Sequence, residues 1–139
     1  MPIAIVRGPA GGGKSQWISE RLQPGEVVID FTRLYVALAG VERGPDGKYP
    51  VRDDGDVRLA LAAWLQLAAI RQAARRELDG YTTTSDSRPE AVERLLAAGA
   101  TGEVVTIDPG RAVVTARLSD PATGALSPQC EAALGRWYR

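Results

Sequence analysis

A glycine-rich segment near the start of the chain has the residue types and spacing of a phosphate-binding loop. It fits the pattern G-x-x-x-x-G-K-[ST] and consists of Gly8, Pro9, Ala10, Gly11, Gly12, Gly13, Lys14 and Ser15. In this pattern backbone N–H groups surround phosphate oxygens, the lysine ammonium reaches the outer phosphates, and the serine hydroxyl ligates Mg²⁺. A helix that begins at Lys14 adds its positive N-terminal end to the same site. The segment therefore predicts nucleotide binding with Mg²⁺.

A flexible glycine linker is the alternative explanation of this segment. Apolar residues flank it on both sides: residues 3–6 are typical of a buried strand, and Trp17, Ile18 and Leu22 follow at helical spacing. A linker needs neither flank, whereas a strand–loop–helix unit needs both. The flanks therefore favour the phosphate site.

Three acidic residues follow predicted strands and are candidates for acid–base chemistry. The chain has no histidine, which leaves carboxylates as the expected proton acceptors at neutral pH. In a parallel sheet, ligands bind at the carboxyl ends of the strands. We therefore expect Asp30, Asp86 and Asp108 to converge with Lys14 and Ser15 on one crevice. For Asp30 a helix cap is the competing explanation, and for Asp86 it is a helix cap or a turn.

The elements that must position these residues alternate along the chain. Apolar and β-branched runs predict strands at 2–6, 26–30, 81–85 and 103–107. Helical spacing and capping residues predict helices at 14–22, 34–39, 56–78, from Pro89 to the closing Gly99, 110–118 and 128–138. This alternation predicts an α/β fold with a parallel sheet of about four strands and helices on both faces, the three-layer arrangement of P-loop NTPases and kinases.

The longest predicted helix carries an apolar stripe that we expect to face the core. Leu61, Trp64, Leu65 and Ala68 fall at i, i+3, i+4 and i+7, and Asp56 is placed to cap the helix. Arginines 71, 75 and 76 on the same helix are typical of a solvated face, with a nucleic-acid contact as the alternative. We also expect the three tryptophans at 17, 64 and 137 to be packing residues. Residues 41–56 are rich in glycine, proline and charge, which predicts a mobile loop.

Length and composition indicate the number of domains, the kinds of partner and the cellular compartment of the protein. The 139 residues predict a single domain, 1–139, and the 17 basic and 17 acidic residues leave no overall attraction to nucleic acid or membrane. Cys130 is the only cysteine, which excludes an internal disulfide and favours a reducing compartment. The longest apolar stretch, 59–70, is too short to span a bilayer, and no charged leader precedes the first apolar run. We therefore expect a cytoplasmic protein without a membrane partner; the sequence carries no signal for its oligomeric state.

The order of these segments resembles the kinase domain of the bacteriophage polynucleotide 5′-hydroxyl kinases, within the wider P-loop kinase group. The resemblance spans nearly the whole chain, but only the phosphate loop is specific by itself. After the loop come a strand leading into an Asp-x-x-Arg at 30–33, a Ser-Asp-Ser at 85–87, a strand ending before Pro109, and a tail that ends Arg136-Trp137-Tyr138. The Asp-x-x-Arg is shared with nucleoside monophosphate kinases, so it indicates phosphoryl acceptance more than it identifies the acceptor.

The resemblance implies roles for individual residues. Lys14 and Ser15 would hold the phosphates of ATP and Mg²⁺, and Asp30 would accept the proton of the acceptor hydroxyl. Arg33 would bind a phosphate of the acceptor, with an ordinary surface position on a helix as the alternative. Asp86 would lie near the substrate and the Mg²⁺ water shell.

A lid is also implied beyond the last strand. Arg117, with Arg111 as second choice, would steady the transferring phosphoryl group, although a plain surface arginine is the alternative. The family pattern has a second lid arginine shortly after, where this chain has Asp120-Pro121, and an acidic residue facing ATP would weaken catalysis. Arg88 stands where the family tends to have Asn, the segment 41–56 has no counterpart, and the accompanying phosphatase domain is missing.

Three functions fit these observations. The leading one is an ATP-dependent kinase that phosphorylates a 5′-hydroxyl of DNA or RNA. The alternatives are a small-molecule nucleoside or nucleotide kinase, and a nucleotide-binding module that has lost transfer activity. Asp30 and Arg33 favour the two kinases, whereas the missing lid arginine favours the third.

Overall fold

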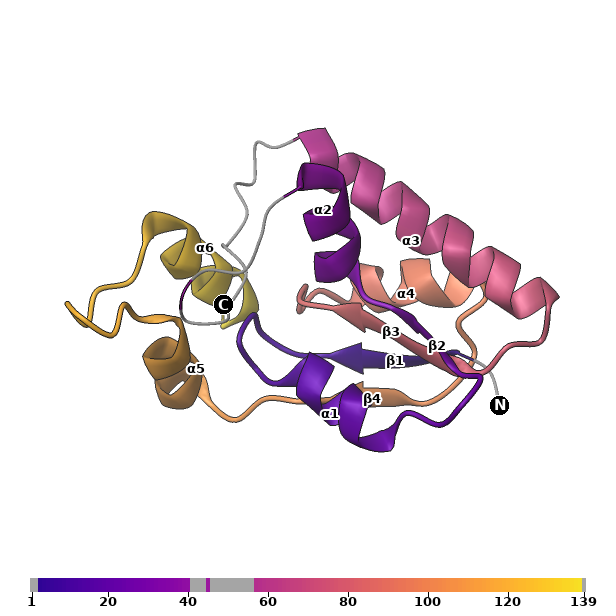
Figure 1. Cartoon of the computed structure of the whole chain (residues 1–139), viewed down its shortest axis with the longest axis horizontal. Coiled ribbons are helices and arrows are strands. Elements are labelled where there is room, and N and C mark those ends of the chain that lie inside the picture. The colour runs from indigo at the N-terminus through magenta and orange to yellow at the C-terminus, as the bar shows by residue number, and fades with distance from the viewer. Residues whose placement is uncertain (1–2, 41–44, 46–56, 139) are drawn as a thin grey trace.

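The computed structural model describes residues 3–40, 45 and 57–138 (Figure 1). Its strands are β1 (Ile3–Arg7), β2 (Val27–Ile29), β3 (Gly80–Thr84) and β4 (Val104–Thr106). Its helices are α1 (Lys14–Arg21), α2 (Phe31–Ala39), α3 (Val57–Arg75), α4 (Pro89–Ala98), α5 (Arg111–Leu118) and α6 (Pro128–Trp137). The mobile loop expected at 41–56 and the cap expected at Asp56 lie outside the described residues.

The four strands form one parallel sheet in the order β2-β3-β1-β4. Ile3 aligns with Gly80 of β3, and Ile5 aligns with Val104 of β4. This confirms the predicted four-stranded parallel sheet. Since all strands run the same way, their carboxyl ends share one edge, and β3 separates β1 from β2 there.

Alternate residues of β1 point to opposite faces of the sheet and belong to different cores. Ile3 and Ile5 pack in a cluster with Ile70 of α3 and with residues of α4, whereas Val6 packs with Ile18 of α1 on the other face. The period of two in a strand dictates this division. Helices therefore cover both faces of the sheet, as the alternation of elements predicts.

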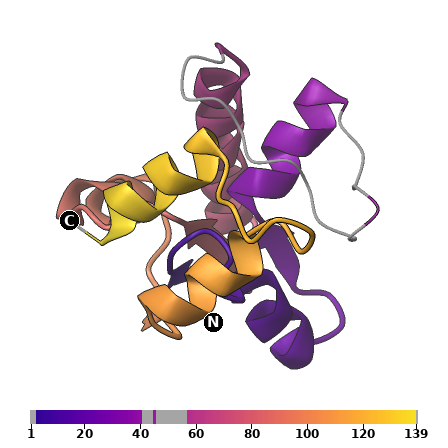
Figure 2. The ribbon, with the colours of Figure 1, turned by 90° about the vertical axis from the view of Figure 1, so that its left-hand side faces the viewer.

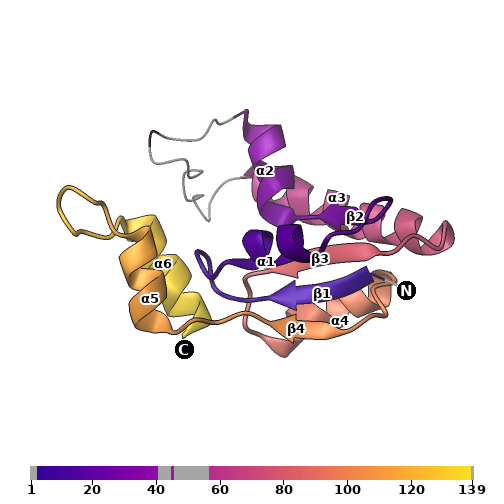
Figure 3. The ribbon, with the colours of Figure 1, turned by 60° about the horizontal axis from the view of Figure 1, so that its bottom comes forward.

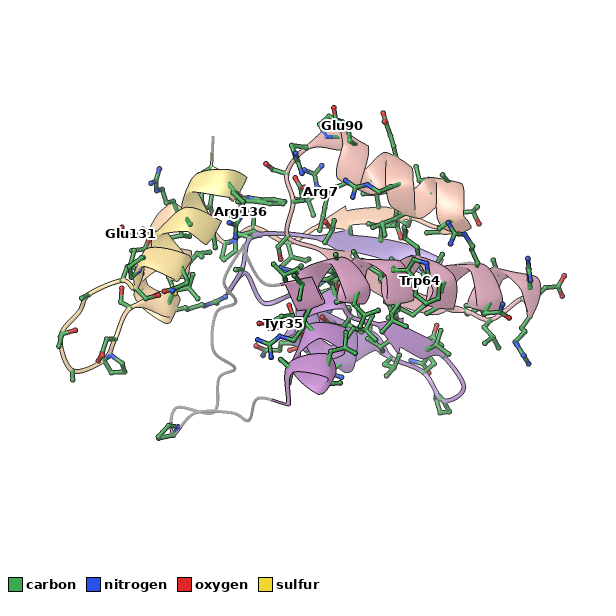
Figure 4. All side chains as sticks on the ribbon, turned by 90° about the horizontal axis from the view of Figure 1, so that it is seen from above. Arg7, Tyr35, Trp64, Glu90, Glu131 and Arg136 are labelled. Carbon is green, nitrogen blue, oxygen red and sulfur yellow. The ribbon has the colours of Figure 1, made fainter. Side chains whose placement is uncertain are left out.

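The buried face of helix α3 is not the face that the sequence analysis predicts. Leu61 and Trp64 are 47% and 61% exposed, so the expected core stripe is wrong, and Trp64 is a surface residue (Figure 4). The buried side chains are Ala62, Gln66, Ile70 and Ala73.

The polar Gln66 lies in the middle of that buried face, and this is the reason for the error. The Gln66 side-chain amide donates to the Thr82 hydroxyl at 2.9 Å and to the Thr83 carbonyl at 2.7 Å. A buried amide is tolerated because its hydrogen bonds are made within the protein. The other two tryptophans do pack as expected: Trp17 meets Tyr81 edge to face at 6.0 Å, and Trp137 is buried.

Two helices begin or end at other residues than predicted, because of local hydrogen bonds and backbone conformation. Helix α2 begins at Phe31 rather than at 34, because the Asp30 carboxylate accepts from the Thr32 amide at 3.0 Å. Helix α3 ends at Arg75 rather than near 78, and Glu77 just beyond it has a left-handed φ of 55°.

Helices α5 and α6 form a hairpin beyond the carboxyl edge of the sheet. In Figure 3 the strand arrows point toward this hairpin, and in Figure 2 it lies in front of the loop between β1 and α1. The described part of the chain contains no helix long and apolar enough to cross a membrane.

Candidate nucleotide and phosphoryl-transfer site

The loop between β1 and α1 has a backbone that only glycine accommodates well. Gly11 and Gly13 have φ values of 75° and 94°, in the left-handed region that side chains disfavour. A Cβ atom on Gly8 would overlap the carbonyl oxygen of Ile107, and one on Gly12 would lie 2.9 Å from the Pro9 carbonyl oxygen. The glycines therefore produce a narrow cradle of backbone, whose N–H groups suit an anion.

Lys14 lies at the start of α1 and points back over this cradle. Its ammonium donates to the carbonyl oxygens of Gly8 at 2.8 Å and Pro9 at 2.9 Å, and to the Ser85 hydroxyl at 2.9 Å. The three acceptors hold the positive charge at the mouth of the loop, between the ends of β1 and β3.

Asp30 is the buried acidic residue of the site. Its side chain is 5% exposed, and one carboxylate oxygen accepts from the Ser15 hydroxyl at 2.9 Å. The other oxygen accepts from the Thr32 amide at 3.0 Å and lies 3.4 Å from the Thr83 hydroxyl. Asp30 is thus a helix cap and also a neighbour of the phosphate loop, so the cap does not exclude the acid–base role that the sequence predicts.

A cavity of about 770 Å³ joins the loop to the ends of β2 and β3. This volume is in the range of small-molecule sites. Lys14, Ser15, Asp30, Arg33 and Asp86 all line it, so the structure brings these candidates together. Apolar side chains of α3 and α4 add to the wall, together with polar residues of the same two helices and of the end of β3.

Of the two candidate lid arginines, Arg117 is the one that reaches the loop. Its guanidinium on α5 donates to the Gly11 carbonyl at 3.1 Å and lines the cavity. Arg111, at the start of the same helix, lies over the Tyr138 ring at 5.9 Å. The fold therefore brings Arg117, the first candidate, to the phosphate loop, whereas Arg111, the second candidate, contacts Tyr138 instead.

Asp86 is paired with a neighbour in the chain. Its carboxylate accepts from the Arg88 backbone amide at 3.0 Å and from the Arg88 guanidinium at 2.6 Å. The Arg88 hydrogen bonds are the main reason why the pKa of Asp86 is lowered. Asp86 therefore stays ionised, with much of its charge balanced by a residue that does not line the cavity.

Asp108 does not join the crevice, contrary to the expectation from its place after β4. Its carboxylate accepts from the Tyr138 hydroxyl at 2.6 Å and from the Trp137 indole N–H at 3.2 Å. The Tyr138 bond is the main reason why the pKa of Asp108 is lowered. Burial and the carboxylate together raise the pKa of Tyr138 to about 12. Asp108 instead ties the end of α6 to the end of β4.

Sequence analysis missed two arginines that line the cavity, Arg94 on α4 and Arg136 on α6. Helical spacing carries a signal for Arg94, because it lies one turn after the buried Ala91 and next to the buried Leu95. For Arg136 no local signal exists, since its place depends on how the α5–α6 hairpin folds back.

Comparisons with known proteins agree with this architecture. No protein-family model matches the chain, and neither does any curated protein sequence. Solved structures do match, among them a tunicamycin resistance protein from Deinococcus radiodurans, with 25% identity and a TM-score of 0.59 over 99% of this chain and 80% of that one. The chain has the fold of P-loop kinases.

Two further solved structures support that assignment of fold. A gluconokinase from Sinorhizobium meliloti is 20% identical, with a TM-score of 0.53 over 97% of this chain and 74% of that one. A sugar kinase from a Janibacter species is 14% identical, with a TM-score of 0.59 over 99% and 78%. These similarities support the P-loop kinase group as a whole and give no support to the polynucleotide kinases in particular.

Proposed function

We propose that this protein is an ATP-dependent kinase that transfers the γ-phosphate to a hydroxyl of a small molecule. The observation that carries the proposal is the placement of Asp30, a buried carboxylate 2.9 Å from the Ser15 hydroxyl of the phosphate loop, in the cavity that Arg117 also lines. Phosphoryl transfer needs positioning, charge neutralisation and a carboxylate near the attacking oxygen, and these residues supply each of them.

The donor set around Ser15 fits Mg²⁺ and the phosphates of ATP. Mg²⁺ prefers oxygen ligands and is commonly held by one or two protein groups together with substrate phosphates. The Ser15 hydroxyl, which donates to the Asp30 carboxylate, is such a group. When bound, the ion neutralises charge on the phosphates. In this proposal Ser15 ligates the ion, Lys14 turns from the loop carbonyls to the outer phosphates, and Arg117 steadies the transferring group.

Asp30 then acts on the acceptor, whose hydroxyl lies between the loop and the end of β2. The carboxylate accepts the hydroxyl proton as the oxygen attacks the γ-phosphorus, the bond between that phosphorus and the bridging oxygen breaks, and ADP leaves. Arg33 binds the acceptor from α2. Two named kinases of sugar-type substrates among the structural neighbours favour a small-molecule acceptor over the 5′ end of DNA or RNA. The balanced net charge agrees with that preference, because it provides no general attraction to nucleic acid.

Loss of transfer activity has less support than the sequence suggested. Asp120, which replaces the second lid arginine, does not line the cavity. Its carboxylate accepts from the Ala122 amide at 2.7 Å, and its carbonyl accepts from Gly124 at 2.7 Å. The Asp120 carboxylate is therefore hydrogen-bonded within its own turn, outside the cavity lining.

The proposal is tested with γ-labelled ATP, Mg²⁺ and a panel of acceptors. The panel contains sugars and sugar acids, nucleosides, nucleotides, tunicamycin because of the name of one structural neighbour, and 5′-hydroxyl oligonucleotides. We expect label in a small molecule and none in the oligonucleotides. Measurable ATP binding without any labelled product would overturn the kinase proposal, and label confined to oligonucleotides would restore the nucleic-acid acceptor.

A further inference from the structure

Gln66 of α3 is a polar residue of the cavity wall that has no role in the mechanism above. It is 6% exposed, so its side chain is almost wholly enclosed by protein. Leu59, Ala63 and Leu67 line the cavity from the same face of α3, at the spacing of successive helical turns. These three side chains carry no hydrogen-bonding group. Gln66 is thus the polar side chain that the described residues of α3 contribute to the cavity.

The hydrogen bonds to β3 determine which way the Gln66 amide faces. Its nitrogen donates to the Thr82 hydroxyl at 2.9 Å and to the Thr83 carbonyl oxygen at 2.7 Å. The Thr82 hydroxyl itself donates to the Ile29 carbonyl oxygen at 2.8 Å, so toward Gln66 it can only accept. Both partners therefore require the nitrogen of Gln66, and both of its N–H groups are used. The side-chain oxygen Oε1 faces away from these two partners.

The Gln66 oxygen has no hydrogen-bond donor among the described residues. In the described part of the chain, the Nε atom of Arg7 is the only side-chain nitrogen or oxygen that is fully buried without a hydrogen bond. The Gln66 oxygen is therefore not sealed inside the core, and the cavity is the open space that Gln66 lines. The cavity thus contains a hydrogen-bond acceptor whose direction is fixed by the fold.

Thr83 connects this acceptor to the proposed base. Its carbonyl oxygen holds the Gln66 amide at 2.7 Å, and its hydroxyl lies 3.4 Å from the Asp30 carboxylate. Gln66, Thr83 and Asp30 all line the cavity. A small acceptor whose hydroxyl meets Asp30 can therefore reach Gln66 with a neighbouring group.

We propose that Gln66 selects the acceptor by accepting a hydrogen bond from a second O–H or N–H group of that molecule. The inference rests on the proposed kinase function and names the substrate class: a small compound with a neutral hydrogen-bond donor near the hydroxyl that is phosphorylated. A bound acceptor excludes water from the Gln66 oxygen, so a compound without this donor would leave a buried oxygen unpaired. Such a site discriminates against an analogue that lacks the donor.

Acceptor analogues that lack one donor test the inference. The parent is the compound of the panel above that is labelled best, with γ-labelled ATP and Mg²⁺. For glucose the analogues are 2-deoxyglucose, 3-deoxyglucose and 4-deoxyglucose, and for uridine they are 2′-deoxyuridine, 3′-deoxyuridine and N3-methyluridine. We expect kcat/KM to fall at least about tenfold when one particular donor is removed. The deoxy analogues and N3-methyluridine distinguish an O–H donor from an N–H donor.

Gln66→Met then assigns the preference to Gln66, because methionine has a similar length but no amide oxygen. This variant should use the parent and the critical analogue within about twofold of each other, with KM for ATP also within about twofold of the wild type. Thr82→Val is the matched control. It also removes a hydrogen bond between α3 and β3, but it leaves the Gln66 oxygen in place, and Thr82 does not line the cavity. The control should keep the wild-type preference.

The wild-type protein provides a second measurement that does not depend on the folding of a variant. NMR of protein labelled with ¹³C at the side-chain carbonyl of glutamine should show the Gln66 resonance moving when the parent compound binds in the presence of ADP. The critical analogue should leave that resonance near its position in the free protein. Gln72, an exposed glutamine of the same helix, is the internal reference.

The outcomes separate this inference from the kinase proposal. An unchanged Gln66 resonance, or the same preference among analogues in the wild type and Gln66→Met, would overturn the inference and leave the kinase function standing. An equal loss of preference in Thr82→Val would show that Gln66 acts only through β3, which also overturns the inference. Bound ATP without transfer to any compound would overturn the kinase function and the inference with it.

Discussion

At the scale of single residues, the contacts of one carboxylate include a helix cap and also fit the base that we propose. Asp30 caps α2 through the Thr32 amide and also accepts from the Ser15 hydroxyl of the phosphate loop. The cap fixes the carboxylate in place, because its position depends on the backbone of the helix it starts. A capping bond therefore orients the group that the mechanism requires as a base.

Asp30→Asn separates the two tasks, since asparagine caps helices as well as aspartate does but is a poor proton acceptor. We expect phosphoryl transfer to fall by about 10²–10⁴-fold, the usual contribution of a general base. Isothermal calorimetry should give an unchanged affinity for ATP, and thermal unfolding should give an unchanged midpoint. Wild-type turnover in this variant would remove Asp30 from its assigned role.

Lys14→Ala tests the phosphate loop itself. The substitution removes the ammonium that now bonds to the carbonyl oxygens of Gly8 and Pro9 and to Ser85. We expect ATP affinity or turnover to be lost, because no other described side chain occupies that position over the loop. Arg75→Gln serves as a control for the loss of one positive charge. Normal affinity together with normal turnover would show that the loop is not the phosphate site.

At the scale of elements, α3 has apolar residues on several sides, and its contacts with the sheet determine which face is buried. The sequence offers two stripes, one through Leu61 and Trp64 and another through Ala62, Gln66 and Ile70. The second stripe is buried because the amide of Gln66 finds two partners on β3. Hydrophobic spacing alone favours the first stripe, since it contains no polar residue.

A pair of alanine substitutions in α3 distinguishes the two faces. Ile70 is fully buried, and Ile70→Ala should lower the free energy of unfolding by about 2–5 kcal/mol. Trp64→Ala should change it by about 0.5 kcal/mol or less, although tryptophan is the larger side chain, because Trp64 is 61% exposed. Urea denaturation followed by circular dichroism measures both. The reverse order of effects would mean that the helix is rotated relative to this structure.

At the scale of the whole molecule, the α5–α6 hairpin completes the site from the far end of the chain. Arg117 and Arg136 reach the cavity from this hairpin. Four contacts anchor it to the sheet. Trp137 and Tyr138 each donate to Asp108 after β4, the Ser87 hydroxyl donates to the Arg136 carbonyl oxygen, and Arg7 at the end of β1 lies over the Trp137 ring at 5.3 Å. The positions of Arg117 and Arg136 therefore depend on contacts at the ends of three strands.

Removal of the Tyr138 hydroxyl should loosen this anchor in a pH-dependent way. The Tyr138 bond lowers the pKa of Asp108 in the folded state, so its stabilisation is present above the carboxyl pKa of the unfolded chain, about 4. It is lost as the pH falls through the lower folded-state pKa. Tyr138→Phe should therefore be less stable than the wild type at pH 7, and the difference should shrink below about pH 4.

Two measurements check this anchor. Urea midpoints of the wild type and Tyr138→Phe, compared between pH 7 and pH 3, should converge at the acidic end. The carboxyl ¹³C shift of Asp108 should titrate at a higher pH in the variant than in the wild type. A stability difference that does not depend on pH would show that Tyr138 acts through packing alone.

Much of the site follows from the sequence because it depends on local rules. The positions of the glycines between Gly8 and Ser15 determine the backbone conformation of the loop. The apolar residues on either side of it predict a strand and a helix. The alternation of strands and helices leads to a parallel sheet, and a parallel sheet gathers Lys14, Ser15 and Asp30 at one edge. Each of these steps uses residues that are close together in the chain.

Tertiary structure decided what depends on contacts between distant segments. The buried face of α3 is set by Gln66 meeting β3, the anchor at Asp108 by Tyr138 thirty residues later, and the place of Arg136 by the hydrogen bond of its carbonyl oxygen with Ser87 after β3. Periodicity describes one element at a time, so it gives no rule for which partner a polar group will find. That choice requires the packed molecule, because a buried polar group must find its hydrogen bond wherever the fold supplies one.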